Sequence, residues 1–476
     1  MSEVDLKKYV DLGLSMGADY VELRFEDLTT EYIVHVNGRI KEIGSSRTVG
    51  IGIRVLVDGH LGFSATDGLS RESLKYAINE AISAAKSTED ITKFSGGEIH
   101  SKSYIIPNIK VHPLSISWEE KVKLVSNIYM NATDVESAIK DRDYCPKDVK
   151  IKNVTIRYVS VSGIKHIVNS EGIEVNFKPL VTGIAISVVS ARNGILGDGY
   201  VTVGGSIDYK VLLDEIYSKV YDATWKSIEK TIAKPPKPYE GTVIVRPEVT
   251  GLFAHESFGH MSEGDFVASG SSPLKDMLGS EIASEHVTIV DSGVVNYKYG
   301  IYLPVDDEGV TTQPVRLVDK GIDSGFLHSR ISAAELGVSS TGNGRAQSHR
   351  HMPIVRMRNT FFEQGDWSEE EMIRECKSGI LVDDGRGGQA ELDGTFTFSA
   401  SRGYIIEKGE IKEPIRDIIL TGNILEMLKH VRGSGKEVLI DAAPFGGCGK
   451  GGQSVYVGIG GPTLLVDLLR VGGRVG

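Results

Sequence analysis

Two histidines and a glutamate near the middle of the chain have residue types and a spacing that could build a metal centre. His255, Glu256 and His260 form the pattern H-E-x-x-x-H. Imidazole nitrogens are common zinc ligands, and an adjacent carboxylate can take a proton from a water held on the ion. We therefore predict that His255 and His260 bind a metal and that Glu256 is the general base.

The spacing of the two histidines requires an unusual helix. Residues five apart on a regular α-helix are rotated by roughly 140°, so their rings diverge. A π-type turn brings such residues back over each other, and Gly259 could absorb the distortion. An apolar strand at 242–245 precedes Pro247, a suitable first helical residue, so we expect a widened helix of roughly 12 to 15 residues. Two ordinary helical histidines are the alternative interpretation.

Cys448 is the candidate third ligand. It lies among the glycines of residues 446–452, where the backbone can approach another surface closely. A His₂Cys set leaves one position open for water, and Lys450 would favour the thiolate. A small apolar cysteine in a tight turn is the alternative. The same loop matches G-x-G-x-x-G but precedes a strand, which is the wrong context for a dinucleotide. Cys145 and Cys376 are expected to be packing residues.

A second cluster of polar residues lies between residues 342 and 360. We predict that substrate is contacted by hydrogen-bond donors from His349, Arg350 and His351. Arg345, Arg350 and Arg356 could also hold a substrate carboxylate in a bidentate manner. A solvated basic flap explains the same residues equally well.

Composition limits the classes of protein to consider. The chain has 476 residues and a net charge of −11, which argues against nucleic acid as a partner. No apolar run is long enough to span a membrane, and the polar N-terminus is not that of a signal peptide. Three widely spaced cysteines do not make a disulfide framework, so we expect a cytoplasmic protein.

The hydrophobic pattern predicts an α+β fold of two domains. Residues 1–233 are expected to form an N-terminal domain of helices and antiparallel sheet, serving substrate access or dimerisation. The prolines of residues 234–238 mark a linker. Residues 239–476 are expected to form a mostly β catalytic domain. Helices are predicted at residues 3–16, 70–87, 117–132, 208–230 and 421–431, and a sheet of four or five strands over residues 19–65 with turns at 37–38 and 58–59.

These motifs together resemble the TldD/PmbA family over essentially the full length of the chain. The resemblance rests on H-E-x-x-x-H at 255–260, the stretch 343–360, Thr421-Gly422-Asn423 and the G-C-G-K loop at 447–450. It points to the TldD branch, which keeps the metal site. In that family the two histidines and the loop cysteine hold Zn²⁺ and the glutamate is the base. The resemblance therefore implies His255, His260 and Cys448 as ligands and Glu256 as the catalytic residue.

The resemblance also implies a metalloprotease that hydrolyses peptides or unfolded protein segments inside a dimer. The dimer would be a homodimer or a heterodimer with a PmbA/TldE-like subunit. Two other functions remain open at this point. The chain could be a non-catalytic scaffold subunit with a structural metal, or an enzyme in which Cys448 is a nucleophile paired with a histidine.

Overall fold

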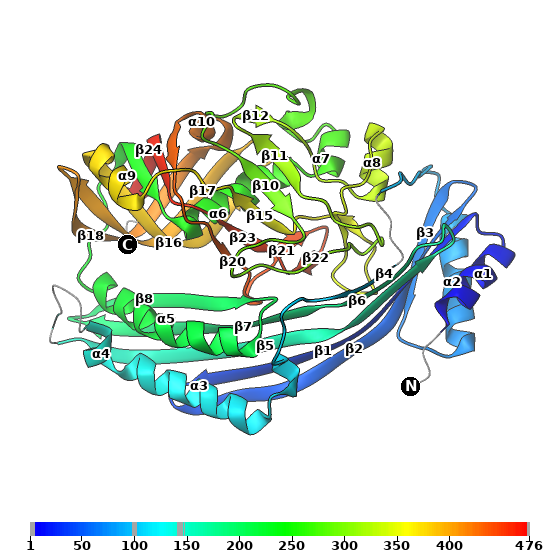
Figure 1. Ribbon diagram of the computed structural model, residues 1–476, viewed down its shortest axis with the longest axis horizontal. Helices are drawn as coiled ribbons and strands as arrows, with labels where there is room; N and C mark the ends of the chain where they lie inside the picture. The colour runs from blue at the N-terminus through cyan, green and yellow to red at the C-terminus, as the bar shows by residue number, and fades with distance from the viewer. Residues whose placement is uncertain (1–4, 98–101, 140–145, 147, 474–476) are drawn as a thin grey trace.

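The chain folds into a long, mostly antiparallel sheet with helices on one face and a mostly β body on the other (Figure 1). The computed structural model describes residues 5–97, 102–139, 146 and 148–473. Helices and strands alternate without regular βαβ units, so the predicted α+β class is confirmed. The two-domain division at residues 233–239 stays a prediction.

The N-terminal sheet has eight strands in the order β3-β2-β1-β5-β6-β4, with β7 on β5 and β8 on β7. Its strands are β1 (Tyr20–Val36), β2 (Arg39–Val57), β3 (His60–Thr66), β4 (Lys102–Ile105), β5 (Lys150–Asn169), β6 (Glu174–Lys178), β7 (Leu180–Arg192) and β8 (Ile195–Gly205). The expectation of four or five strands over residues 19–65 is wrong, because three strands cover that range. β1 and β2 continue through polar segments because β5 pairs along nearly the whole length of β1 and supplies its backbone partners.

Five α-helices are described in this half, and the sequence predicts all of them except the short helix Val135–Ile139. They are α1 (Leu6–Ser15), α2 (Arg71–Ala85), α3 (Trp118–Thr133), α4 (Val135–Ile139) and α5 (Tyr209–Lys230). Ser70, Ser117 and Asp208 accept hydrogen bonds from backbone N–H groups in the first turns of α2, α3 and α5, so these starts are set by the sequence. In Figure 1, α3 and α5 cover one face of the sheet and α1 and α2 lie at its far end.

The C-terminal half is built from two six-stranded sheets. The first has the order β12-β11-β10-β15-β23-β20 and consists of β10 (Ile289–Ser292), β11 (Val315–Asp319), β12 (Ile322–Asp323), β15 (Asn359–Phe362), β20 (Leu439–Asp441) and β23 (Gly458–Gly461). The second has the order β18-β17-β16-β9-β24-β19 and consists of β9 (Tyr239–Val245), β16 (Ser378–Ala390), β17 (Thr395–Glu407), β18 (Glu410–Asn423), β19 (Val431–Ser434) and β24 (Leu464–Gly473). β18 also pairs with β24, which closes five of these strands into a ring.

Shorter elements complete this half. They are α6 (Pro247–Leu252), a π-helix (Phe253–Gly259), α7 (Gly264–Ala268), α8 (Arg330–Leu336), α9 (Glu369–Cys376), α10 (Ile424–Lys429), and the paired strands β13 (Gly344–Arg345) with β14 (Ile354–Val355) and β21 (Cys448–Lys450) with β22 (Gln453–Val455). The helix predicted at 421–431 is shorter than expected, because β18 runs on to Asn423, whose side chain caps α10. Among the described residues, no helix is long and apolar enough to cross a membrane.

Buried charges join the two halves. Arg54 on β2 is 1% exposed and forms ion pairs with Glu22 on β1 and with Glu308 from the C-terminal half. The guanidinium of Arg24 donates to the backbone carbonyls of Ser348 and His351. Ion pairs enclosed in this way are costly to separate, so the halves are held in a fixed relation.

Candidate metal centre

The widened helix predicted from the histidine spacing is present. α6 begins at Pro247 and continues as a π-helix over Phe253–Gly259, where the backbone N–H of His260 donates to the carbonyl of His255. This i to i+5 hydrogen bond stacks the two residues on one side of the helix. Their ring centroids are 5.3 Å apart with an interplanar angle of 75°.

Close packing explains the glycine before the second histidine. A Cβ atom on Gly259 would collide with the sulfur of Met357 and would lie 3.0 Å from the carbonyl oxygen of Ala254. Gly251 on α6 is confined in the same way, since its Cβ would lie 2.9 Å from the backbone nitrogen of Gly460 on β23. The helix is therefore pressed against its neighbours, which fixes the direction of the histidine rings.

The glycine-rich loop brings Cys448 to these rings. β21 and β22 form a hairpin whose turn residues, Gly451 and Gly452, have positive φ angles of 56° and 72°. The Sγ atom of Cys448 lies 3.5 Å from Nε2 of His260. One donor atom from each of His255, His260 and Cys448 lies within 4.8 Å of the others, although Cys448 is 188 residues from His260 in sequence.

The donor set fits a metal ion. His255 is 1% exposed, and neither of its ring nitrogens has a hydrogen-bond partner within the part of the chain that the structure describes. A buried imidazole with no partner is costly unless a ligand satisfies it. Two imidazoles and a thiolate are ligands that zinc prefers, and three protein ligands leave a fourth position open.

The electrostatics favour a thiolate at this site. Burial alone would raise the pKa of Cys448, but the neighbouring His255 and His260 lower it to about 5. Burial opposes the charged form of His260, yet hydrogen bonds to Cys448 and Glu263 raise its pKa to about 10. In the metal-free protein, Cys448 and His260 therefore form a thiolate–imidazolium pair near neutral pH.

Glu263 is a residue of the candidate site that sequence reasoning missed. Its buried carboxylate lies 3.1 Å from Nδ1 of His260 and 3.0 Å from Nζ of Lys450. A carboxylate on the outer nitrogen of a histidine orients the ring and leaves Nε2 free for a metal. A glutamate three residues after His260 was the available signal. Lys450, expected to act on the thiolate directly, instead holds Glu263 and Asp265.

Arg356 supports the loop that carries Cys448. Its guanidinium is fully buried and donates to the carbonyl of Cys448 on β21 and to that of Gln453 on β22. Arg345 is also buried and donates to the carbonyls of Met357 and Tyr456. The guanidinium groups of both arginines thus bind backbone carbonyls inside the protein and are not free to bind a substrate carboxylate.

Glu256 points to a cavity beside the three candidate ligands. Its side chain is 38% exposed, and its Oε2 lies 3.9 Å from Nε2 of His260. The cavity has a volume of about 460 Å³ and is lined by Glu256, His260, Phe266, residues 388–392 and residues 449–451. Because Glu256 follows His255 directly on the helix, the two side chains diverge, and Glu256 reaches this space while His255 stays buried.

This cavity is not lined by His349, Arg350 or His351. His349 is fully buried, and its Nε2 lies 2.8 Å from Asp67. Arg350 is exposed and forms a bidentate pair with the same aspartate, while Nδ1 of His351 lies 3.0 Å from the hydroxyl of Ser348. Their role in substrate binding stays a prediction.

Cys376 is buried on α9, as expected of a packing residue, and Cys145 lies outside the described residues.

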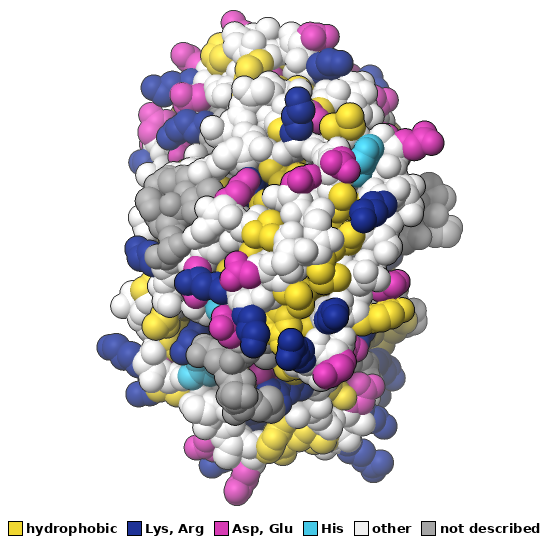
Figure 2. Space-filling view, turned by 90° about the vertical axis from the view of Figure 1, so that its right-hand side faces the viewer, with side chains coloured by type: hydrophobic (Ala, Val, Ile, Leu, Met, Phe, Trp, Pro, Cys, Tyr) yellow, Lys and Arg dark blue, Asp and Glu magenta, His cyan; other side chains and the backbone are white. Residues whose placement is uncertain are grey.

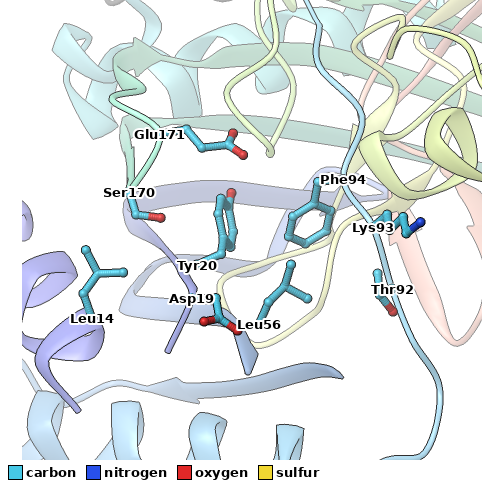
Figure 3. Close-up of a pocket in the computed structure, with 9 residues that line it drawn as sticks. All are labelled: Leu14, Asp19, Tyr20, Leu56, Thr92, Lys93, Phe94, Ser170 and Glu171. Atoms are coloured by element: carbon cyan, nitrogen blue, oxygen red, sulfur yellow. The ribbon is translucent and has the colours of Figure 1, made fainter. Parts of the chain in front are cut away.

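A second cavity, of about 550 Å³, lies in the N-terminal half and shares no lining residue with the first. Figure 3 shows the rings of Tyr20 and Phe94 side by side in its lining, with centroids 4.8 Å apart and an interplanar angle of 59°. Arg54 and Arg330 each lie over the ring of Phe94. These aromatic residues belong to the charged contact between the halves and carry no metal-binding group.

Comparison with known proteins shows which family the whole chain resembles. Family models match residues 21–85 as PmbA/TldA metallopeptidase domain 1, 111–233 as the central domain and 238–473 as the C-terminal domain. A metalloprotease of Methanocaldococcus jannaschii is 34% identical over 463 residues, which is 96% of each chain. The chain belongs to the PmbA/TldD metallopeptidase family.

Other relatives in this family carry related names. A protein of Saccharolobus solfataricus named zinc metalloprotease TldD homolog is 29% identical and covers 98% of this chain and 100% of its own. A metalloprotease TldD homolog of Haemophilus influenzae is 30% identical, with coverage of 99% and 97%. The crystal structure of TldE from Thermococcus kodakarensis superposes with a TM-score of 0.79 at 20% identity, covering 98% of this chain and 100% of that one, which shows a shared fold.

Proposed function

We propose that this member of the PmbA/TldD family is a zinc-dependent metallopeptidase that cleaves peptides or unfolded protein segments. The observation that carries the proposal is the convergence of His255, His260 and Cys448 beside a cavity that Glu256 enters. Zn²⁺ bound there would polarise the scissile carbonyl and acidify a water. The names of the relatives support the same reaction class.

Each residue of the site has a defined task in this proposal. His255, His260 and Cys448 hold the ion, and the hydrogen bond that His260 donates to Glu263 keeps the ring in the ligating tautomer. Glu256 takes the proton of the attacking water at its carboxylate and passes it to the leaving amine. Burial of the ligands excludes competing water from their side of the site, so the open face is the one that Glu256 shares with the cavity.

The edge of β16 offers a place for the substrate backbone. β16 pairs with β9 only at Ile380–Val382, whereas its other side pairs with β17 as far as Ala390. In the described part of the chain, the first side therefore has no strand partner beyond residue 382, and residues 388–392 line the cavity with Glu256. An extended peptide can add to such an edge through backbone hydrogen bonds, which bind with little regard to sequence.

The test separates metal binding from catalysis. Glu256→Gln should keep stoichiometric zinc and lose cleavage of an internally quenched peptide by at least about 100-fold. Cys448→Ala should lose both zinc and cleavage. Cleavage at the wild-type rate by Glu256→Gln, with contaminating proteases excluded, would remove Glu256 as the base.

A second function has one observation in its favour. The thiol of Cys448, with its low pKa and a histidine nitrogen 3.5 Å away, resembles a cysteine–histidine nucleophile pair. Cys448 is only 2% exposed, however, and does not line the cavity. A metal chelator decides between the two functions, because it should abolish activity of the zinc enzyme and leave a cysteine protease active. A scaffold with a structural metal is less well supported, because the donor group among the described residues has three members where a closed zinc site has four.

We also propose a dimer, either with a second copy or with a PmbA/TldE-like subunit. Figure 2 shows a band of hydrophobic side chains across one face of the molecule, bordered by charged ones. Exposed hydrophobic residues at this end include Leu14 on α1 and Tyr76 on α2. Such a band is typical of an interaction surface. Light scattering of the purified chain, alone and with the partner, should give the mass of two subunits.

A further inference from the structure

The cavity beside Glu256 has an apolar wall. Phe266 and Leu392 both line it, and both side chains are partly exposed. The Nζ atom of Lys450 lies 4.2 Å from the ring centroid of Phe266, so the lysine sits over one face of the ring. A wall formed by these two apolar side chains suits an aliphatic side chain or the methylene stem of a longer one.

The ammonium group of Lys450, which lines this cavity, already has partners. Nζ of Lys450 lies 2.7 Å from Asp265, 3.0 Å from Glu263 and 3.2 Å from the carbonyl oxygen of Val355. These three acceptors match the three N–H donors of an ammonium group. Lys450 is therefore unable to bind a carboxylate of a substrate without losing a partner.

The carboxylate of Glu391, unlike the ammonium group of Lys450, has no charged or hydrogen-bonding partner among the described residues. Glu391 is exposed, lines the cavity, and its carboxylate makes no hydrogen bond or ion pair with any residue that the structure describes. It directly follows β16, whose edge is proposed above to hold the substrate backbone. A carboxylate at this place attracts a cation carried by the bound chain.

From these contacts we propose that Glu391 makes the site selective for peptides with a lysine or arginine side chain close to the scissile bond. The methylene stem packs on Phe266 and Leu392, and the ammonium or guanidinium group pairs with Glu391. This inference rests on the proposed peptidase function, whose substrate class it narrows. It assigns Glu391 a role in specificity and none in the chemical step.

Kinetics test the selectivity on the zinc-loaded enzyme. The substrates are N-acetylated, C-amidated quenched peptides that differ at one position, scanned on both sides of the cleaved bond, where lysine, norleucine or glutamate is placed. Norleucine keeps the length of the lysine stem without its charge. At the selective position, wild type should cleave the lysine peptide with a kcat/KM about fivefold above that of the norleucine peptide, as expected for one partly exposed ion pair.

Two variants of Glu391 and one matched control complete the design. Glu391→Gln should remove the preference for lysine, and Glu391→Lys should reverse it in favour of glutamate. Glu413→Lys makes the same charge change at an exposed residue of β18 outside the cavity and should keep the wild-type preference. Equal kcat/KM for lysine and norleucine at all positions, or an unchanged preference in Glu391→Gln, overturns the proposal. A preference that appears only without the N-acetyl group also overturns it, because the bound cation is then the α-amine.

Binding to metal-free protein separates this inference from the proposed function. Fluorescence anisotropy with labelled lysine and norleucine peptides should show a tighter Kd for lysine, weakened by Glu391→Gln and by added salt. If the zinc-loaded enzyme cleaves no peptide, the peptidase proposal fails, while this binding difference still supports selection by Glu391. If cleavage occurs but neither Kd nor kcat/KM depends on Glu391, the inference fails alone.

Discussion

Nδ1 of His260 lies 3.1 Å from Oε2 of Glu263, a carboxylate with no exposed surface. Lys450 reaches the same oxygen from the Cys448 hairpin, 3.0 Å away. The π-helix and the hairpin are thus connected by a second contact behind the candidate ligands. The orientation of His260 depends on this contact as much as on the helix that carries it.

Glu263→Gln should lower zinc affinity by about 10- to 100-fold, because the amide is a weaker acceptor for the ring N–H of His260 and carries no charge for Lys450. Competition with a chromogenic chelator measures this affinity. Glu256→Gln is the matched control. It makes the same change in a glutamate that is proposed as the base and not as the residue that orients a ligand. Equal affinity of Glu263→Gln and wild type would show that Glu263 does not orient the ligand.

Arg356→Met should weaken metal binding without touching a ligand. The change leaves the carbonyls of Cys448 and Gln453 without their buried donor, so the hairpin should lose its fixed position. Cobalt-substituted protein reports this directly, because the thiolate-to-cobalt absorption band should weaken or shift. Arg356→Lys should restore some of the band. Arg350→Met makes the same replacement at an exposed arginine and should leave the band unchanged.

Alkylation of the metal-free protein should distinguish its cysteines by pH. The pKa of Cys448 is lowered to about 5 by the two histidines, whereas burial raises that of Cys376 to about 11. The thiolate reacts with iodoacetamide, so the rate at Cys448 should stay level from about pH 8 to about pH 6 and fall below about pH 5. Cys376 should react little throughout. Peptide mapping by mass spectrometry follows both residues. A rate at Cys448 that rises about tenfold per pH unit across the neutral range would contradict the low pKa.

The sequence predicted the ligand-bearing helix because its signals are local. Pro247 starts the helix, and the five-residue spacing of the histidines is compatible with a shared site only if the helix widens. The positions of α2, α3 and α5 were predicted for the same reason, since their apolar periodicity is local. Cys448 could be named as a candidate metal ligand because glycines surround it. The spacing alone did not connect it to His260, which is 188 positions away in the sequence.

Long-range pairing decided the features that the sequence did not predict. β1 and β2 are single long strands because β5 supplies partners along β1, information that neither strand contains alone. Arg356 was interpreted either as a substrate-binding arginine or as part of a solvated basic flap, because its acceptors are backbone carbonyls, which leave no trace in a sequence. The burial of His349 was not predicted either, because its partner, the carboxylate of Asp67, is 282 residues away in the sequence. Polar residues that serve buried contacts are therefore the hardest to interpret before the fold is known.

Asp323→Asn should stabilise the protein at alkaline pH. Asp323 is 1% exposed, its carboxylate oxygens have no hydrogen-bond partner among the described residues, and burial raises its pKa to about 7. In the unfolded chain the pKa is about 3.9, so the native state alone binds this proton between those values. Stability from this group is therefore full below about pH 4 and is lost as the pH rises through about 7. The uncharged amide avoids that loss and nearly keeps the shape of the side chain.

The melting temperature of Asp323→Asn should exceed that of wild type by about 2 °C at about pH 8, which corresponds to roughly 2 kcal/mol after allowance for solvent screening. The difference should shrink as the pH is lowered to about 5, because wild type then keeps the proton. Asp319→Asn is the control, since the side chain of Asp319 is 46% exposed and pairs with Arg316 on the same strand. Its effect should be small at both pH values. A variant that melts below wild type under alkaline conditions would mean that the charged carboxylate has a favourable partner in solution.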